Sequence, residues 1–290
     1  MPDAPYTLVL GIAQDAGYPQ AGTKSSPAWD EPSLRRLATC LALVDPRSGR
    51  RWLFDATPDF KEQLHRLDTV APDPRIPGLD GIFLTHAHIG HYTGLIHLSR
   101  EAIGSRALPV HAMPRMERFL RENGPWEQLI TLGNIVIWPL REGTAIALAP
   151  DITVTPLLVP HRDEYSETVA FSIAGPNHAV LFLPDINGWD DWEAMGTHIE
   201  DVLATVDVAY LDGTFLNALE LPGRDLREIP HPLITSSIER FATLPVSERT
   251  KIRFIHLNQS NPLIRDDAEP HTWFREAGVG AAQEGEIVKL

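Results

Sequence analysis

The chain has 290 residues, of which 43% are hydrophobic and 22% are charged, and its formal net charge is −14. This length and apolar content suit a folded globular protein with a large core and exclude a mostly disordered chain. The acidic balance argues against a broad nucleic-acid surface, because binding to a phosphate backbone needs clustered Lys and Arg. We therefore expect a small-molecule substrate and no nucleic-acid partner.

Strand and helix patterns run along the whole chain. The patterns predict strands at residues 6–12, 39–45, 51–55, 82–84, 109–112, 136–149, 152–159, 168–174, 178–184, 206–212 and 251–257. They predict helices at residues 59–67, 93–103, 114–123, 192–203 and 232–243. Residues 20–34 are rich in Ser, Pro and Gly and are expected to form an irregular surface excursion. Strands come first in pairs and later alternate with helices, which predicts an α/β fold with two sheets between helices, in a single domain of residues 1–290.

The sequence shows neither a membrane segment nor a disulfide framework. It contains one cysteine, Cys40, and no run of about 18 apolar residues. The first residues lack the basic and apolar regions of a signal peptide. We expect no membrane partner and a cytoplasmic location, with a periplasmic or secreted protein as the alternative if a signal peptide has been removed. The oligomeric state cannot be read from these patterns.

Three histidines follow an apolar strand pattern in the middle of the first half. The stretch GIFLTHAHIGHYTGLIHLS carries His86, His88 and His91 on one strand-to-helix turn. Residues two apart at a strand end face the same side, so His86 and His88 can converge, and His91 can face the same point from the helix start. Neutral imidazole is a common zinc ligand, so this pattern favours a metal site. Three surface histidines on a polar loop are the alternative.

Four more apolar runs stop at a residue that can bind or assist a metal. These residues are His161, Asp185, Asp212 and His256. Because α/β folds place their chemistry at the carboxyl ends of strands, we expect His161, Asp185 and His256 to share the metal site. Asp55 also ends a strand, and we expect it to support ligand histidines without contacting metal. If no metal binds, capping of a turn is the alternative for Asp185.

This order of residues resembles the ligand order of the metallo-β-lactamase superfamily, which implies an αββα sandwich with the site at one edge of the two sheets. The segments LGIAQDAGYPQ, FDATPDF, LDGTF, HPLI and FIHLNQSNPL look most like its PqqB branch, associated with biosynthesis of pyrroloquinoline quinone. The resemblance implies a first metal held by His86, His88 and His161. It implies a second metal held by His91 and His256, with Asp185 bridging or completing the shell.

The chain also departs from the family pattern. PqqB proteins usually carry a cysteine-rich zinc knot after the first loop, but residues 21–29 contain no cysteine. They also tend to have acidic or amide residues where this chain has His86 and His88, so it looks like a hydrolase on the PqqB scaffold. Members with two metals usually have aspartate where this chain has Gly90. We expect a weak second site, or a carboxylate from another loop, with Asp15 the best candidate and a turn-forming role its alternative.

The expected cofactor is zinc, as one or two ions, with iron or manganese as alternatives. A metal-activated water, oriented by Asp185, would attack a small phosphodiester, ester or lactone. By resemblance to phosphodiesterase-like members, Asp212 works with His231, which donates a proton to the leaving group. A purely structural contact between Asp212 and His231 is the alternative. Two other functions stay open: a PqqB-like iron-dependent oxygenase in quinone cofactor biosynthesis, and a non-catalytic metal-binding protein on the same scaffold.

Overall fold

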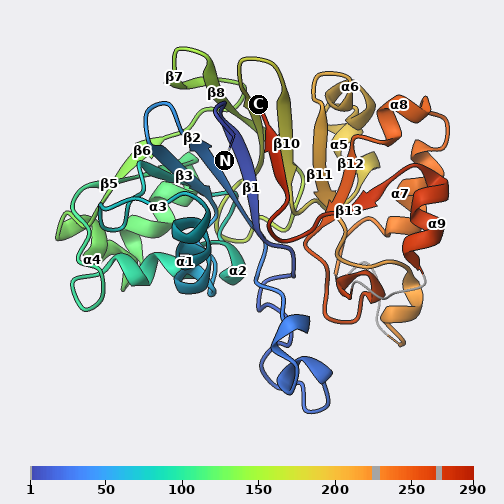
Figure 1. Ribbon diagram of the computed structural model, residues 1–290, viewed down its shortest axis with the longest axis horizontal. Coiled ribbons are helices and arrows are strands. Elements are labelled where there is room, and N and C mark those ends of the chain that lie inside the picture. The colour runs from blue at the N-terminus through green and yellow to red at the C-terminus, as the bar shows by residue number, and fades with distance from the viewer. Residues whose placement is uncertain (1, 224–228, 266–269) are drawn as a thin grey trace.

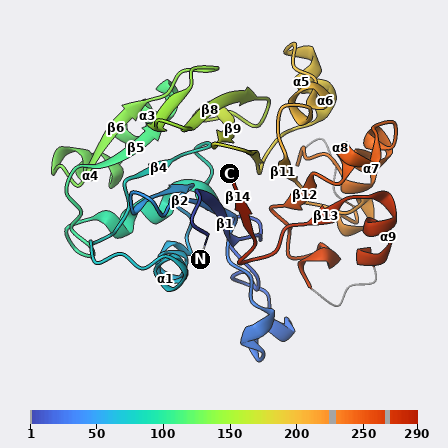
Figure 2. The ribbon, with the colours of Figure 1, turned by 45° about the horizontal axis from the view of Figure 1, so that its top comes forward.

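The computed structural model describes residues 2–223, 229–265 and 270–290. Two β-sheets of seven strands each lie face to face, and helices cover the outer face of each sheet (Figure 1, Figure 2). Helices α1 to α4 lie on one side of this sandwich and α5 to α9 on the other (Figure 1). These four layers confirm the predicted αββα arrangement.

The first sheet has the strand order β14-β1-β2-β3-β4-β5-β6. Its strands are β1 Tyr6–Gly11, β2 Cys40–Asp45, β3 Arg50–Phe54, β4 Gly81–Phe83, β5 Leu108–Ala112, β6 Ile135–Pro139 and β14 Ile287–Lys289. The pairs from β14 to β3 are antiparallel and those from β3 to β6 are parallel. Its helices are α1 Phe60–Val70, α2 Ile89–Tyr92, α3 Pro114–Glu122, α4 Trp126–Thr131 and a 3-10 helix, Thr93–Leu98.

The second sheet has the strand order β13-β12-β11-β10-β9-β8-β7. Its strands are β7 Ile146–Ala149, β8 Ile152–Val159, β9 Thr168–Ala174, β10 Ala179–Leu183, β11 Val208–Asp212, β12 Ile252–Ile255 and β13 Gly280–Ala281. The pairs from β13 to β10 are parallel and those from β10 to β7 are antiparallel. Its helices are α5 Trp189–Ala194, α6 Ile199–Leu203, α7 Ile234–Phe241, α8 Val246–Arg249 and α9 Pro270–Ala277.

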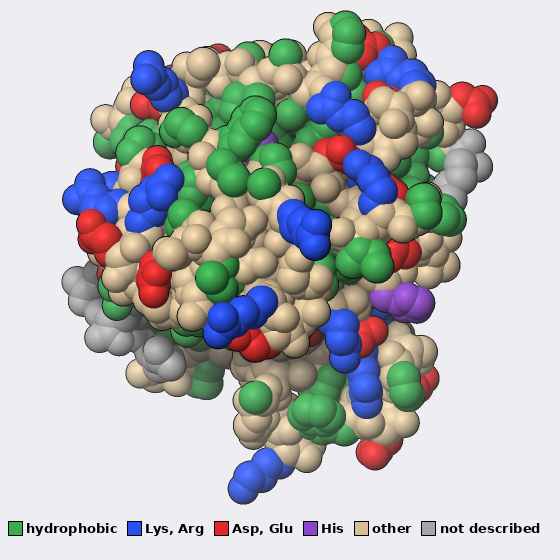
Figure 3. Space-filling model, turned by 90° about the vertical axis from the view of Figure 1, so that its left-hand side faces the viewer, with side chains coloured by type: hydrophobic (Ala, Val, Ile, Leu, Met, Phe, Trp, Pro, Cys, Tyr) green, Lys and Arg blue, Asp and Glu red, His purple; other side chains and the backbone are tan. Residues whose placement is uncertain are grey.

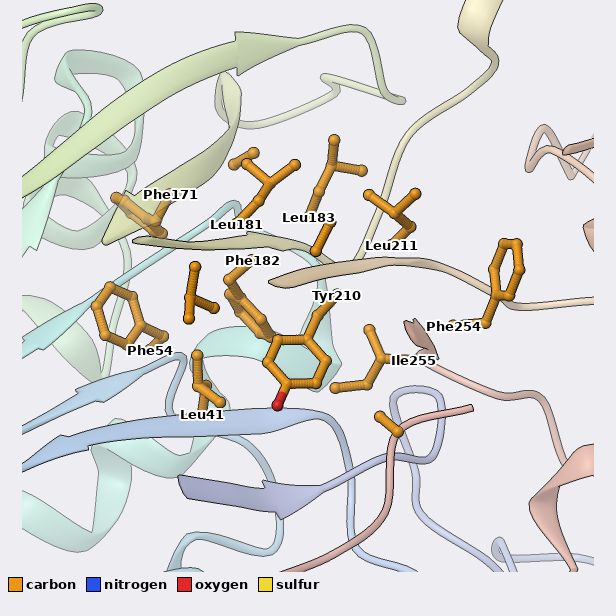
Figure 4. Packing of buried hydrophobic residues seen from close by; sticks show 14 of the residues in the cluster. Leu41, Phe54, Phe171, Leu181, Phe182, Leu183, Tyr210, Leu211, Phe254 and Ile255 are labelled. Carbon is orange, nitrogen blue, oxygen red and sulfur yellow. The ribbon is translucent and has the colours of Figure 1, made fainter. Parts of the chain in front are cut away.

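The hydrophobic core between the sheets is made by inward-facing side chains of both. Leu41 and Phe54 of the first sheet face Phe182 and Tyr210 of the second (Figure 4). The ring of Phe54 lies 5.4 Å from that of Phe171 and 6.2 Å from that of Phe182, measured between centroids. Fully burying each such side chain stabilises the fold by about 1.5–3 kcal/mol. This packing fixes the strand ends, where the candidate site lies.

The predicted strand at 136–149 is wrong as a single element. The structure splits it into β6 and β7, which belong to opposite sheets. Between them Gly143 has a φ of 65°, in the left-handed region that glycine adopts without a steric penalty. The hydropathy pattern has the same period before and after this turn, so it does not show that the chain passes from one sheet to the other. This segment therefore carries the chain from the first sheet to the second.

Two predicted helices also differ from the structure. The predicted helix at 93–103 is a 3-10 helix, Thr93–Leu98, that follows α2, and the Gly94 N–H donates to the carbonyl of Ala56 at 2.9 Å and not within an α-helix. The predicted helix at 192–203 is divided into α5 and α6 at Gly196, whose φ is 91°. Helices α4, α8 and α9 and strands β13 and β14 were not predicted, since each is short or begins next to a proline.

The predicted excursion at residues 20–34 projects from the body of the molecule (Figure 1) and is seen from another side in Figure 3. It contains two 3-10 helices, Pro27–Trp29 and Pro32–Leu34. The indole of Trp29 donates to the Thr23 carbonyl at 2.6 Å, and Arg35 donates to the carbonyls of Ala28 and Trp29. These bonds hold a loop that contains no cysteine. In the part of the chain described, no helix has the length and apolar character needed to cross a membrane.

Candidate metal centre

Polar side chains from both sheets meet at the carboxyl ends of the strands. The residues that end or closely follow a strand there are Asp15 after β1, Asp55 after β3, His86 after β4, His161 after β8, Asp185 after β10, Asp212 in β11 and His256 after β12. Within each sheet these strands are parallel to one another, because β3 and β4 as well as β10, β11 and β12 pair in parallel and two antiparallel steps separate β1 from β3 and β8 from β10. Their carboxyl ends therefore share one edge, as the sequence predicted.

The first group of histidines is His86, His88 and His161, whose nitrogen atoms lie within 4.8 Å of one another. The His161 Nε2 atom is 3.3 Å from the His88 Nδ1 atom. The ring of His86 is centred 4.4 Å from that of His88 and 5.3 Å from that of His161. His86 and His161 are buried and His88 is half-buried. The structure thus brings together the three residues predicted to hold a first metal.

The second group is His91 and His256, which face the carboxylate of Asp185. The Asp185 Oδ2 atom lies 3.1 Å from His91 Nε2 and 3.4 Å from His256 Nε2. The other oxygen of Asp185, Oδ1, lies 3.7 Å from His161 Nε2 in the first group. Asp185 therefore stands between the two groups, with one oxygen toward each. Asp15 approaches the second group as well, with its Oδ1 atom 3.3 Å from His91 Nε2 and 3.8 Å from His256 Nε2.

Asp55 and Thr85 contact the Nδ1 atoms of two of these histidines, His91 and His86. The Asp55 Oδ2 atom lies 2.7 Å from His91 Nδ1, on the side of the ring away from the other histidines. Asp55 also accepts hydrogen bonds from the Thr85 N–H at 2.8 Å and the Thr85 hydroxyl at 2.9 Å. The same hydroxyl lies 3.0 Å from His86 Nδ1. Such outer contacts fix ring orientation and leave each Nε2 atom directed into the site, which is the supporting role expected for Asp55.

The residues present fit a bound metal ion. Four buried atoms of this site have no hydrogen-bond partner among the described residues, namely His86 Nε2, His91 Nε2, His256 Nε2 and Asp185 Oδ2. Leaving one buried polar group unpaired costs about 1–3 kcal/mol, and a ligand bound among these four atoms would offset that loss. Imidazole nitrogen and carboxylate oxygen are the donors that zinc takes, and iron and manganese accept them too. A metal-binding geometry is therefore present, and it does not fix the identity of the metal.

The protonation states suit metal binding in the first group. Burial lowers the pKa of His86 well below its ordinary value and that of His161 to about 4, so both rings are neutral at pH 7. Burial by itself would raise the pKa of Asp185, but the facing His256 and His91 hold it well below the usual range. Neutral imidazoles and an ionised carboxylate are the ligating forms of these groups.

His231 and Asp212 form a pair beside the two groups. The His231 Nδ1 atom lies 2.7 Å from Asp212 Oδ2, and the ring of His231 is centred 5.4 Å from that of His161. The Thr214 hydroxyl donates to Asp212 Oδ1 at 2.7 Å and lies 3.0 Å from the Nδ1 atom of His256. Burial would lower the pKa of His231, but the Asp212 carboxylate raises it above the ordinary value. The predicted pair is thus formed, with its ring next to the first group.

Sequence reasoning missed several contributors. Thr85 directly precedes His86 and Thr214 lies two residues after Asp212, and this closeness in sequence was the available signal. Glu164 carries no such signal, yet its Oε2 atom lies 3.1 Å from His88 Nε2. The backbone adds a further mark of the site, because three of its non-glycine residues have positive φ: Asp15 (23°), Asp55 (69°) and His256 (63°). Such strained residues cluster at functional sites.

The comparisons with known proteins agree with this geometry. Residues 50–260 match the family model of the beta-lactamase superfamily domain. Coenzyme PQQ synthesis protein B of Xanthomonas campestris pv. campestris (strain B100) is 24% identical over 98% of this chain and 99% of its own length. The protein of the same name from Methylococcus capsulatus (strain ATCC 33009 / NCIMB 11132 / Bath) is 26% identical over 97% and 98%.

Solved structures share the fold. The Zn(2+)-bound PqqB from Methylobacterium extorquens has a TM-score of 0.79 at 21% identity, and the match covers 98% of this chain and 100% of that one. A diphosphatase from the PhnP family has a TM-score of 0.65 at 20% identity, over 99% and 97%. From the matched family model, which covers most of the chain, we conclude that this chain belongs to the metallo-β-lactamase superfamily, and within it the full-length relatives of 24–26% identity make it similar to PqqB proteins.

Proposed function

We propose that this protein is a metal-dependent hydrolase acting on a small phosphodiester, ester or lactone. The observation that carries the proposal is the convergence of unpaired buried donor atoms from both sheets on one point, described above for the metal centre. The first metal would be held by His86, His88 and His161, and the second by His91 and His256, with Asp185 facing both. Bound zinc would lower the pKa of a coordinated water toward neutrality and polarise the bond under attack.

Asp185 is the carboxylate we assign to orienting the attacking water. It is buried between the two groups, where a bound metal ion would keep it ionised, and its carboxylate can accept a hydrogen bond from that water. Gly90 cannot take this role because it has no side chain. The position of Asp185 between the two groups supports the assignment.

His231 is the group we assign to protonating the leaving oxygen. Its Nδ1 atom is engaged by Asp212 at 2.7 Å, which leaves Nε2 as the nitrogen that donates the proton. Asp212 raises the pKa of this imidazole, so the acid form persists to higher pH than in a free histidine. Proton donation by a positioned side chain contributes about 100- to 10,000-fold to such reactions.

Among the three substrate classes, a phosphodiester has additional support. Glu164, which contacts His88, lines a cavity of about 270 Å³ together with Glu122, Arg115 and Arg118. Arg115 is paired with Asp163 at 2.9 Å, whereas Arg118 is exposed on α3. A guanidinium pairs well with phosphate oxygens, and a neutral ester or lactone offers no such charge.

The test is a turnover assay on protein loaded separately with zinc, iron and manganese. Chromogenic phosphodiesters, esters and lactones are offered to the wild type and to His88→Ala, with His178→Ala, a histidine in the turn between β9 and β10, as the matched control. We expect turnover by the wild type and the control, and its loss together with one metal ion in His88→Ala. Full metal content without turnover of any substrate contradicts the hydrolase and leaves a metal-binding protein without catalytic activity.

A second candidate is a PqqB-like iron-dependent oxygenase in quinone cofactor biosynthesis. The specific observation in its favour is that relatives named coenzyme PQQ synthesis protein B match this chain over 97–98% of its length. Histidine and carboxylate donors also suit iron. Production of pyrroloquinoline quinone by a strain that lacks its own PqqB, restored by this chain, would favour the oxygenase. The hydrolase proposal expects no restoration.

A further inference from the structure

Asp15 fills the space in which a side chain at position 90 would lie. Gly90 is in α2, next to His91. A Cβ atom at Gly90 would lie 2.1 Å from Asp15 Oδ1, 2.4 Å from its Cα and 2.8 Å from its Cβ. Cβ atoms in proteins essentially never come within 3.0 Å of other heavy atoms. A side chain at position 90 and Asp15 in its present position therefore exclude each other.

The carboxylate of Asp15 is directed at the second group of histidines. Its oxygen and the Nε2 atoms of His91 and His256 lie within 4.8 Å of one another. Both nitrogens are buried and make no hydrogen bond within the described chain, so they are unpartnered groups aimed at the same point as the carboxylate.

The backbone holds Asp15 in this position. The Gln14 N–H donates to the Leu257 carbonyl at 2.8 Å, and the Leu257 N–H donates to the Ile12 carbonyl at 2.8 Å. These bonds tie the loop after β1 to the segment that follows His256. Asp15 itself has a φ of 23°, a strained value that persists only where surrounding contacts enforce it.

We propose that Asp15 is a ligand of the second metal ion, a carboxylate supplied by the loop after β1 in place of one at position 90. The inference rests on the proposed two-metal site and adds a ligand to it. Residue 15 lies outside the matched span of the family model, residues 50–260, so the match does not assign it a role. Together with His91, His256 and Asp185, it gives the second ion four protein donors, the usual number for zinc.

The first test removes the charge of Asp15 and keeps its size. Asp15→Asn and the wild type are loaded with zinc, and bound zinc is measured by mass spectrometry and calorimetric titration. We expect two ions in the wild type and one tightly bound ion in Asp15→Asn, with the second ion weakened at least 10- to 100-fold. Asp30→Asn, an exposed aspartate in the excursion, is the matched control and should keep two ions.

The second test displaces Asp15 without removing any ligand. Gly90→Ala places a methyl group against Asp15, so it should also lose the second ion. The control for steric strain alone is Gly175→Ala, whose Cβ would lie 2.2 Å from the Cβ of Leu290, far along the chain from the site. That variant should keep two ions. Circular dichroism of the metal-free proteins checks that each variant is folded.

The outcomes separate this inference from the proposed function. If the wild type binds two ions and both Asp15→Asn and Gly90→Ala keep two with unchanged affinity, Asp15 is not a ligand and only this inference fails. A wild type with a single ion also overturns it, while the first metal and the hydrolase proposal stand. If the wild type binds no metal, the proposed function itself fails.

Discussion

Replacing His231 with asparagine tests the proposed proton donor. The side chain is 2% exposed and its Nδ1 atom is tied to Asp212, so it is held in a fixed orientation beside the metal groups. Asparagine keeps a polar side chain but cannot act as an acid near neutral pH. For a substrate whose leaving oxygen needs a proton, we expect kcat/KM to fall about 100-fold or more. A 100-fold loss corresponds to about 2.7 kcal/mol of transition-state stabilisation.

The assay uses a series of aryl phosphodiesters whose leaving groups range from 4-nitrophenol to unsubstituted phenol. 4-Nitrophenolate leaves without a proton, so His231→Asn should lower its rate only slightly, whereas the rate for phenol should fall by the full factor. The rate of the variant should therefore depend more steeply on the leaving group than the rate of the wild type. His198→Asn, an exposed histidine on the surface, is the matched control and should behave as the wild type.

Two results would refute this reasoning. An equal loss of rate for every leaving group would mean that His231 positions the substrate or the site and does not donate a proton. Loss of a metal ion would make it a ligand, an outcome the geometry allows because donor atoms of His231, Asp212 and Asp185 lie within 4.8 Å of one another. Metal content is therefore measured on the same samples.

Four further predictions follow from the contacts described above. Because Asp212 raises the pKa of His231, the rate for poor leaving groups should fall as the pH rises through that raised pKa, as the alkaline limb of a pH–rate profile will show. Asp55→Asn should weaken metal binding about 10- to 100-fold in chelator competition, because Asp55 orients His91. Arg118→Ala should raise KM for phosphodiesters and leave KM for neutral esters unchanged. Phe171→Ala should lower the free energy of unfolding in urea by about 3–5 kcal/mol, since its ring is fully buried between the sheets.

The strand ends were the part of the site that the sequence could predict. An apolar run that stops at His161, Asp185 or His256 marks both the strand and the functional residue, because strand ends in an α/β fold share one edge. The fold class followed from the same alternation of strands and helices. The resemblance to a known family then supplied the grouping of the histidines, which spacing alone left open.

The rest depends on contacts that hydropathy does not record. Nothing local to Gly90 indicates which carboxylate lies next to it, and only the folded chain brings Asp15 there from 75 positions away. Glu164 reaches His88 from a loop without strand or helix periodicity. The split between β6 and β7 was missed for a similar reason, because a strand pattern gives the face of each side chain but not the sheet to which the strand belongs.

Each of the two sheets supplies residues to each of the two groups of candidate metal ligands. His86 and His91 come from the first sheet, while His161, Asp185 and His256 come from the second. A metal ion held by residues of both sheets would therefore link them at the strand ends. Closing the sandwich buries the unpaired nitrogens, which costs stability without a ligand, and it also brings them within reach of a common ligand. Metal binding and the alignment of the two sheets are thus expected to stabilise each other.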